Sequence, residues 1–117
     1  MKIAVVGTCA SGKTTVVARL RVLGHNAYVV SQEHSIVRDL WLHQQPDALV
    51  FLESDYQTVC LRRGGSWPRW LFDLQNARLV HARVHADLVV NTASLSIEET
   101  IETISMFIRR RHEQPSS

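Results

Sequence analysis

Short, nearly continuous apolar runs alternate along the chain with longer segments in which apolar residues recur at helical spacing. The runs consist mostly of valine, leucine, isoleucine and alanine, a pattern typical of parallel strands that are buried on both faces. We therefore expect about four strands in one sheet. The predicted strands span residues 3–6, 27–30, 48–52 and 87–91.

Between these runs, apolar residues spaced three or four apart predict helices, and several of the helices carry end signals. The first helix is expected to stop at Gly24, a residue type that favours helix ends. Ser54 and Ser96 each open a pattern typical of a capping box, and Ser66 is a candidate cap for a helix with Pro68 in its first turn. The predicted helices span about residues 14–23, 35–44, 55–63, 67–84 and 97–111.

Strands that alternate with helices predict an α/β fold in three layers, a small parallel sheet of about four strands flanked by helices. The chain has 117 residues, which is enough for one domain and too few for two. We expect this domain over residues 1–111, followed by a polar tail over 112–117. Ligands of such sheets bind beyond the carboxyl ends of the strands, where the strand order reverses.

The segment from Gly7 to Thr14 matches the P-loop, or Walker A, pattern G-x-x-x-x-G-K-[ST] at every fixed position. It lies between a predicted strand and a predicted helix, where backbone N–H groups and the helix dipole favour a phosphate. Lys13 is expected to reach the β- and γ-phosphates, and the Thr14 hydroxyl to bind Mg²⁺. The predicted phosphate-binding residues are Gly7, Cys9, Ala10, Ser11, Gly12, Lys13, Thr14 and Thr15.

Phosphate transfer also needs an acidic residue near the metal or the attacking hydroxyl, and no predicted strand ends in aspartate. Glu33, two residues beyond the second apolar run, is our candidate for a magnesium ligand or general base. A solvated loop carboxylate or a helix N-terminal charge explains Glu33 equally well. Glu53 and Asp55 follow the third run, but their position before a helix is explained by the helix dipole alone.

Arg62 and Arg63 precede the pair Gly64 and Gly65, which is expected to interrupt the helix. Such a segment can close over a phosphate, because guanidinium groups stabilise the charge that spreads over the phosphoryl oxygens. A surface loop that happens to carry arginines is the alternative.

Composition narrows the other possibilities. The net charge is +2, and the arginine cluster at 109–111 has no aromatic residues among it, so we do not expect nucleic acid as a ligand. No apolar run approaches the roughly 20 residues that a membrane helix needs, and the first strand begins too early for a signal peptide. Cys9 and Cys60 lack metal-type spacing and are expected to be reduced thiols in a cytoplasmic protein.

Taken together, these segments resemble the P-loop kinases, the nucleoside and nucleotide kinase branch of the P-loop NTPases. Residues 28–33 with Arg38 and Trp41 are similar to the segment of deoxynucleoside kinases that carries a catalytic glutamate. Residues 46–53 before the arginine pair resemble the strand that leads into the lid helix, and residues 86–99 resemble the final strand and helix. The resemblance implies a three-layer P-loop NTPase fold, a catalytic role for Glu33, and adenine contacts by Asn91 and Thr92.

We expect an ATP-binding protein that transfers the γ-phosphate to a small hydroxyl-bearing acceptor, with ATP and Mg²⁺ bound. Lys13, Glu33, Arg62 and Arg63 are the predicted catalytic residues. The alternative is a nucleotide-binding regulatory module with little or no turnover, which the small size and the missing strand-end aspartate favour. The chain has no N-K-x-D guanine motif, so ATP is expected over GTP. The sequence does not reveal the acceptor. It also leaves the oligomeric state undecided between a monomer and a homodimer.

Overall fold

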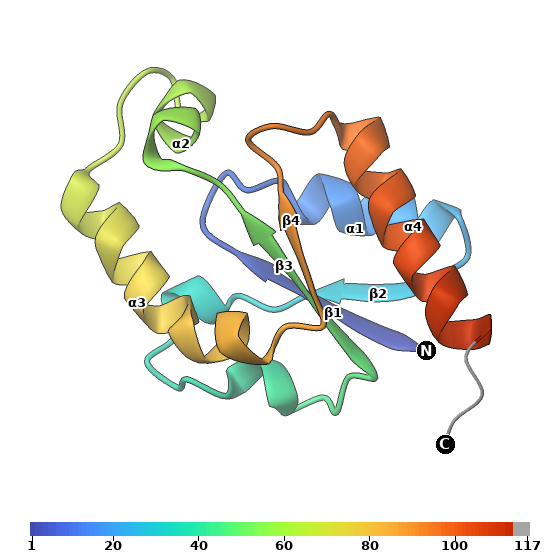
Figure 1. Ribbon diagram of the computed structural model, residues 1–117. Helices are drawn as coiled ribbons and strands as arrows, with labels where there is room; N and C mark the ends of the chain where they lie inside the picture. Colours follow the sequence, from blue (N-terminus) through green and yellow to red (C-terminus); the bar gives the residue numbers. More distant parts are fainter. Residues whose placement is uncertain (114–117) are drawn as a thin grey trace.

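The computed structural model describes residues 1–113 and contains one sheet of four parallel strands (Figure 1). Along the sheet the strands are ordered β2-β1-β3-β4. Their bounds are β1 Lys2–Gly7, β2 Asn26–Val29, β3 Ala48–Glu53 and β4 Leu88–Asn91. Each lies within one or two residues of its predicted position, so the predicted parallel α/β sheet is confirmed.

Within the described residues, four α-helices and two short 3₁₀ turns connect and follow the strands. The helices are α1 Lys13–Val22, α2 Tyr56–Arg62, α3 Arg69–His85 and α4 Ile97–Glu113. The 3₁₀ turns are η1 Gln32–His34 and η2 Leu40–Leu42. None of the helices in this part of the chain combines the length and apolarity that crossing a bilayer requires.

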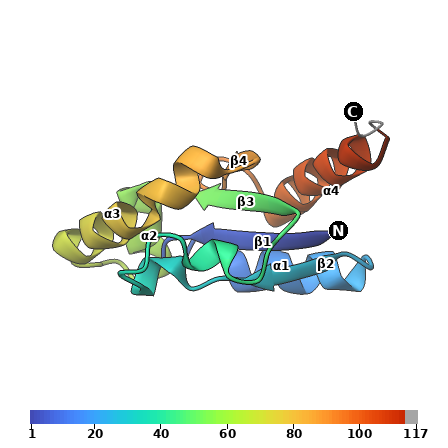
Figure 2. The same cartoon turned by 90° about the horizontal axis from the view of Figure 1, so that it is seen from below.

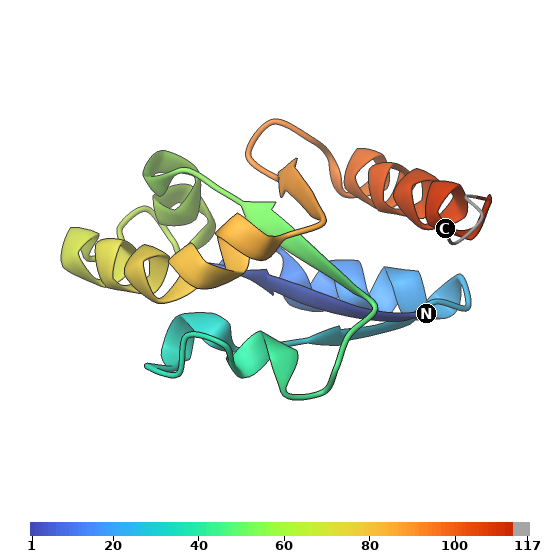
Figure 3. The same cartoon turned by 60° about the horizontal axis from the view of Figure 1, so that its bottom comes forward.

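Helices cover both faces of the sheet. Successive strand residues point to opposite sides, and both sides carry apolar side chains that need cover. On one face, Ile3 and Val5 of β1 pack with α1 and α4. On the other face, Ala4 and Val6 pack with Trp41 of η2 and with α3 (Figure 3). Every side chain of β1 from Ile3 to Val6 is thus buried, which explains the unbroken apolar run.

The strand order places the end of β1 at the centre of the molecule. The chain passes from β1 to one neighbour, β2, and then crosses to the other neighbour, β3. Figure 2 shows β1 and β3 pointing the same way, toward the end of the sheet where α2 lies. The order therefore reverses beside β1, and this reversal creates the crevice in which open α/β sheets bind ligands.

The predicted helix over residues 35–44 is wrong. In its place are an extended residue at Ser35, a bend and the turn η2. The buried amide of Gln32 explains this: its Nε2 donates to the carbonyl of Val37 at 2.6 Å, and its Oε1 accepts from the backbone N–H of Trp41 at 3.0 Å. The side chain thus takes over bonds that a helix would make internally, and it leaves Ile36 87% exposed.

Helix ends differ from the predictions at three places. Ser54 does not cap α2, because the Asp55 side chain accepts from the N–H of Thr58 at 2.7 Å instead. Helix α3 begins after Pro68, without the predicted side-chain cap from Ser66. Helix α4 continues to Glu113, two residues beyond its predicted end, and residues 114–117 of the predicted tail lie outside the described residues.

The capping box at the start of α4 is confirmed. The Ser96 hydroxyl accepts from the N–H of Glu99 at 3.1 Å, and the Glu99 carboxylate accepts from the N–H of Ser96 at 2.9 Å. Two backbone donors that a free helix end would leave unpaired are thereby satisfied.

Candidate functional site

The segment from Gly7 to Thr14, here called the glycine-rich loop, turns sharply from β1 into α1. Ala10 and Gly12 have left-handed backbones, with φ of 62° and 96°. Gly7 lies against the neighbouring strand, where an added Cβ would stand 2.6 Å from the carbonyl oxygen of Leu52. Gly12 is the N-cap residue of α1 and has no side chain that could accept a hydrogen bond. The first N–H groups of α1 therefore have no side-chain cap.

The Lys13 ammonium lies beneath this loop and is fully engaged. Its Nζ donates to the carbonyls of Gly7 and Thr8 at 2.9 Å each, and to Glu33 Oε2 at 2.6 Å. The side chains of Lys13 and Glu33 are 9% and 3% exposed. A buried ion pair of this kind is costly to desolvate and is weak evidence of a stabilising role, which directs attention to function.

Several buried polar atoms around this pair have no hydrogen-bond partner in the described chain. They are Thr8 Oγ1, Ser11 Oγ and the second carboxylate oxygen of Glu33, Oε1. Unpaired buried polar groups are rare in folded proteins because each costs about 1–3 kcal/mol. Their concentration beside one loop indicates a place where a polar ligand can complete the bonding.

The mouth of the loop is open to solvent. Thr14 and Thr15, at the start of α1, are exposed. Together with Ala10, Gly12 and Lys13 they line a hollow of about 210 Å³. The start of α1, where backbone N–H groups favour an anion, therefore borders a space open to solvent.

Arg62, at the end of α2, bridges two loops at the same end of the sheet. Its Nη1 donates to the carbonyl of Ala10 at 2.7 Å, and its Nη2 donates to the carbonyl of Thr92 at 2.6 Å. Arg63 has no hydrogen bond to the glycine-rich loop in the described chain; its guanidinium stacks on Trp67, with its carbon 4.3 Å from the ring centroid, and the residue lines the cavity beside the loop. Of the two predicted catalytic arginines, only Arg62 contacts the loop.

A cavity of about 580 Å³ lies between the glycine-rich loop, the end of α2 and the start of α4. Its lining includes Ala10, Thr15, Arg62, Thr92 and Thr100. The Thr100 hydroxyl is buried there without a partner. The volume lies within the range usual for small-molecule sites.

The predicted adenine contacts are placed differently from each other. Thr92 is buried and lines the cavity, with its N–H and hydroxyl both bonded to the carbonyl of Glu53. Asn91 is exposed, and its side chain accepts from the N–H of Ala93 at 2.9 Å, which holds the turn after β4. Only Thr92 of the pair faces the cavity.

The other strand-end acids have structural partners. The Glu53 carboxylate pairs with Arg83 at 2.9 Å. The hydrogen bond from the Thr58 backbone N–H lowers the pKa of Asp55, which caps α2. Glu33 is therefore the only one of the three candidate carboxylates that contacts Lys13.

Sequence reasoning missed two residues of α3 that hold the site from behind. The buried amide of Gln75 accepts from the N–H of Cys9 at 3.0 Å and donates to its sulfur at 3.2 Å. Arg78 donates to the carbonyl of Glu33 at 3.4 Å. The available signal was a glutamine within the apolar stripe of Phe72 and Leu79, since polar residues at core positions need partners.

The chain was compared with known proteins. Neither the models of known protein families nor the curated protein sequences gave a match.

Proposed function

We propose that this chain is a P-loop NTPase of the kinase type that binds ATP with Mg²⁺ at the glycine-rich loop. The observation that carries this proposal is the buried Lys13 ammonium at the base of an open, uncapped helix start. A buried ammonium is costly to desolvate, and at this position it suits a triphosphate that enters from solvent. Reduced thiols at Cys9 and Cys60 are consistent with the cytoplasmic location we also propose.

The phosphates would occupy the hollow at the loop mouth. Loop N–H groups would bind the phosphate oxygens, and Lys13 would exchange its bond to Glu33 for bonds to the β- and γ-phosphates. The residues also fit Mg²⁺, because Thr14 presents an exposed hydroxyl and Glu33 Oε1 is a free carboxylate oxygen. When bound, the ion would neutralise charge on the phosphate oxygens.

The nucleoside would lie in the adjoining cavity. Arg62 and Thr92 border it, and Thr100 contributes a buried hydroxyl without a partner. A buried hydroxyl without a partner favours a ligand that brings a matching polar group. A ligand without such a group leaves the hydroxyl unpaired, and its desolvation cost remains. We assign adenine and ribose to this space.

For phosphate transfer, the acceptor is a small molecule that carries a hydroxyl group. Its oxygen would bond to the γ-phosphorus as the bond from that phosphorus to the bridging oxygen of ADP breaks. Once the phosphates draw Lys13 away, Glu33 is free to take the hydroxyl proton. Arg62, released from its carbonyl partners, would stabilise charge on the transferring group, and Arg63 would support it from the same segment.

A regulatory nucleotide-binding module is the second candidate, and one observation favours it. Glu53 and Asp55 are committed to Arg83 and to the α2 cap, so of the three strand-end acids only Glu33 is in place for chemistry. Such a module would bind ATP and signal the bound state without turning it over.

Calorimetry with ATP and Mg²⁺ tests the shared core of both candidates. We expect binding by the wild-type chain, and its loss in Lys13→Ala, because the phosphates lose their only buried cation. Lys2→Ala is the matched control, since Lys2 is the only other lysine and lies at the opposite end of β1. Absence of binding by folded wild-type protein, or equal loss in both variants, would contradict the proposal.

Turnover separates the two candidates. Glu33→Gln keeps the shape of the side chain and removes the proton acceptor, so a kinase variant should bind ATP and fail to transfer phosphate. The assay follows ADP release with a panel of small alcohols, sugars and nucleosides. A wild-type chain that binds ATP with Mg²⁺ but releases no ADP with any acceptor, or alone, supports the regulatory module instead.

A further inference from the structure

We propose that Cys9 of the glycine-rich loop, together with Glu33 and His34 of η1, forms a binding site for a thiophilic divalent cation of the zinc type. Each residue offers one ligand atom, and these three atoms lie within 4.8 Å of one another. No other group of three such residues is brought together in residues 1–113. The proposal concerns the free chain and does not depend on nucleotide binding.

The distances match the edges of a tetrahedral zinc site. Zinc–sulfur bonds of about 2.3 Å and zinc–nitrogen or zinc–oxygen bonds of about 2.0–2.1 Å imply ligand separations of about 3.3–3.6 Å. Cys9 Sγ lies 3.6 Å from His34 Nε2, and His34 Nε2 lies 3.8 Å from Glu33 Oε2. The sulfur–nitrogen edge is thus at its bound length before any ion is present. The Glu33 carboxylate lies beside His34 through Oε2, the oxygen that also accepts from Lys13, and the ion would take the second oxygen, Oε1.

The donor set decides which kind of cation fits. A thiolate sulfur and an imidazole nitrogen suit zinc and similar ions, whereas Mg²⁺ and Ca²⁺ prefer oxygen ligands alone. Cys9 would lose its proton to solvent on binding, so its thiolate would balance one charge of the ion, and the Glu33 carboxylate would be shared between the ion and Lys13. Three protein ligands leave one tetrahedral position for water.

Outer contacts already hold the ligands in place, as they do in established metal sites. The Gln75 amide binds both the N–H and the sulfur of Cys9, and its Nε2–H donor suits a thiolate. Arg78 holds the backbone of Glu33 through its carbonyl. Both residues come from α3, so the cluster is braced by a helix distant in sequence.

Glu33 can serve the ion without giving up Lys13. Its Oε2 accepts from Lys13, while its Oε1 is buried and has no partner in the described chain. A buried carboxylate oxygen in this state carries a desolvation cost that a cation would relieve. His34, with 58% of its side chain exposed, supplies the route from solvent.

The test is titration of the untagged, nucleotide-free chain with Zn²⁺ by calorimetry, and with Co²⁺ as a spectroscopic probe, in a reductant that does not bind metal. We expect one ion per chain, and a thiolate-to-cobalt charge-transfer band with the visible bands of tetrahedral Co²⁺. Cys9→Ser should abolish the charge-transfer band. Cys9→Ser and His34→Asn each remove a ligand, so each should weaken zinc binding. We expect a loss of at least roughly 10–100-fold, which is what losing a residue that only supports a ligand costs.

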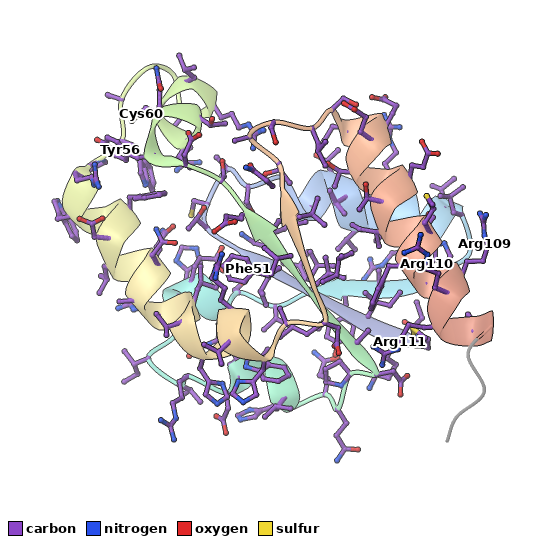
Figure 4. All side chains as sticks on the ribbon, in the orientation of Figure 1. Phe51, Tyr56, Cys60, Arg109, Arg110 and Arg111 are labelled. Atoms are coloured by element: carbon purple, nitrogen blue, oxygen red, sulfur yellow. The ribbon has the colours of Figure 1, made fainter. Side chains whose placement is uncertain are left out.

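Matched controls come from residues outside the cluster. Cys60→Ser, on α2 (Figure 4), and His43→Asn, beside Asp39, should bind zinc as the wild type does. Circular dichroism of each variant establishes that it is folded. A stoichiometry well below one, a charge-transfer band that survives Cys9→Ser, or loss of the band in Cys60→Ser would overturn the proposal.

Discussion

The two ends of the sheet treat their polar groups in opposite ways. At the amino end, where the strands begin, each acidic side chain is paired: Asp47 accepts from the N–H of Lys2 at 2.6 Å, and Asp87 from the N–H of Leu49 at 2.7 Å. Arg111, from the arginine run at the end of α4 (Figure 4), adds a bond to Asp87 at 3.3 Å. These groups close the ends of the strands.

Buried oxygens without a partner gather mainly at the carboxyl end, although the Tyr28 hydroxyl near Asp47 is one at the amino end. Thr8, Ser11, Glu33 and Thr100 each bury an oxygen that has no partner in the described chain. A fold selected for stability alone would replace such groups, because each costs about 1–3 kcal/mol. The paired groups at the amino end stabilise the fold. The unpaired groups at the carboxyl end are unfavourable for stability, and retaining such groups is typical of ligand sites.

The two lysines give the largest expected contrast between these ends. Lys13→Ala leaves Glu33 buried without its cation, so we expect a loss of about 3–5 kcal/mol in the free energy of unfolding. Lys2 has a backbone carbonyl as its partner, that of Gln44, in an exposed setting. Lys2→Ala should cost only about 0.5–1.5 kcal/mol. Urea denaturation at neutral pH measures both values.

A double substitution separates the charge from the packing. Lys13→Met with Glu33→Leu removes both ions, so stability should return to the wild-type value or exceed it. ATP binding should still be lost, because the cation is gone. If Lys13→Ala and Lys2→Ala were equally destabilising, the contrast between the two ends of the sheet would fail.

Two buried threonines of the cavity provide a sharper and smaller contrast. The Thr100 hydroxyl has no partner, so Thr100→Val should raise the free energy of unfolding by about 1 kcal/mol. The Thr92 hydroxyl donates to the carbonyl of Glu53 at 3.2 Å, so Thr92→Val should lower it by about 0.5–1.5 kcal/mol. Both changes preserve side-chain shape, and thermal or urea unfolding reports the sign. Shifts of the same sign in the two variants would contradict this reading of the cavity.

The sequence predicts the sheet well because burial on both faces leaves a strong local signal. Ile3 to Val6 and Ala48 to Leu52 are unbroken apolar runs, and both are buried strands. The helix predicted over 35–44 fails because the side chain of Gln32, just before it, takes bonds to the backbone of Val37 and Trp41. Apolar periodicity cannot reveal a side-chain-to-backbone bond of that kind, which competes with the helix.

The candidate site divides in the same way. The loop and Lys13 follow from a contiguous motif, and Glu33 was placed by its position after a strand. The contacts of Cys9 with Gln75 and with His34 join residues 66 and 25 positions apart, so no sequence motif predicts them. The contact with Gln75 exists because the chain returns α3 to the glycine-rich loop, which only the folded structure shows.

Acid titration gives the smallest expected effect and tests the paired groups of the carboxyl end. The hydrogen bond from the Ser96 backbone N–H lowers the pKa of Glu99. The folded state thus favours the ionised form, and this stabilisation exists above the unfolded pKa and is lost as the pH falls through the folded pKa. Glu99→Gln should therefore show a flatter decline of the urea midpoint than the wild type between roughly pH 6 and pH 3. Ser96→Ala removes the hydroxyl, the second cause of the lowered pKa of Glu99, but keeps the backbone N–H, which is the largest, so it should lower stability and flatten the decline less than Glu99→Gln does. An unchanged decline in Glu99→Gln would show that this carboxylate contributes nothing to the acid response.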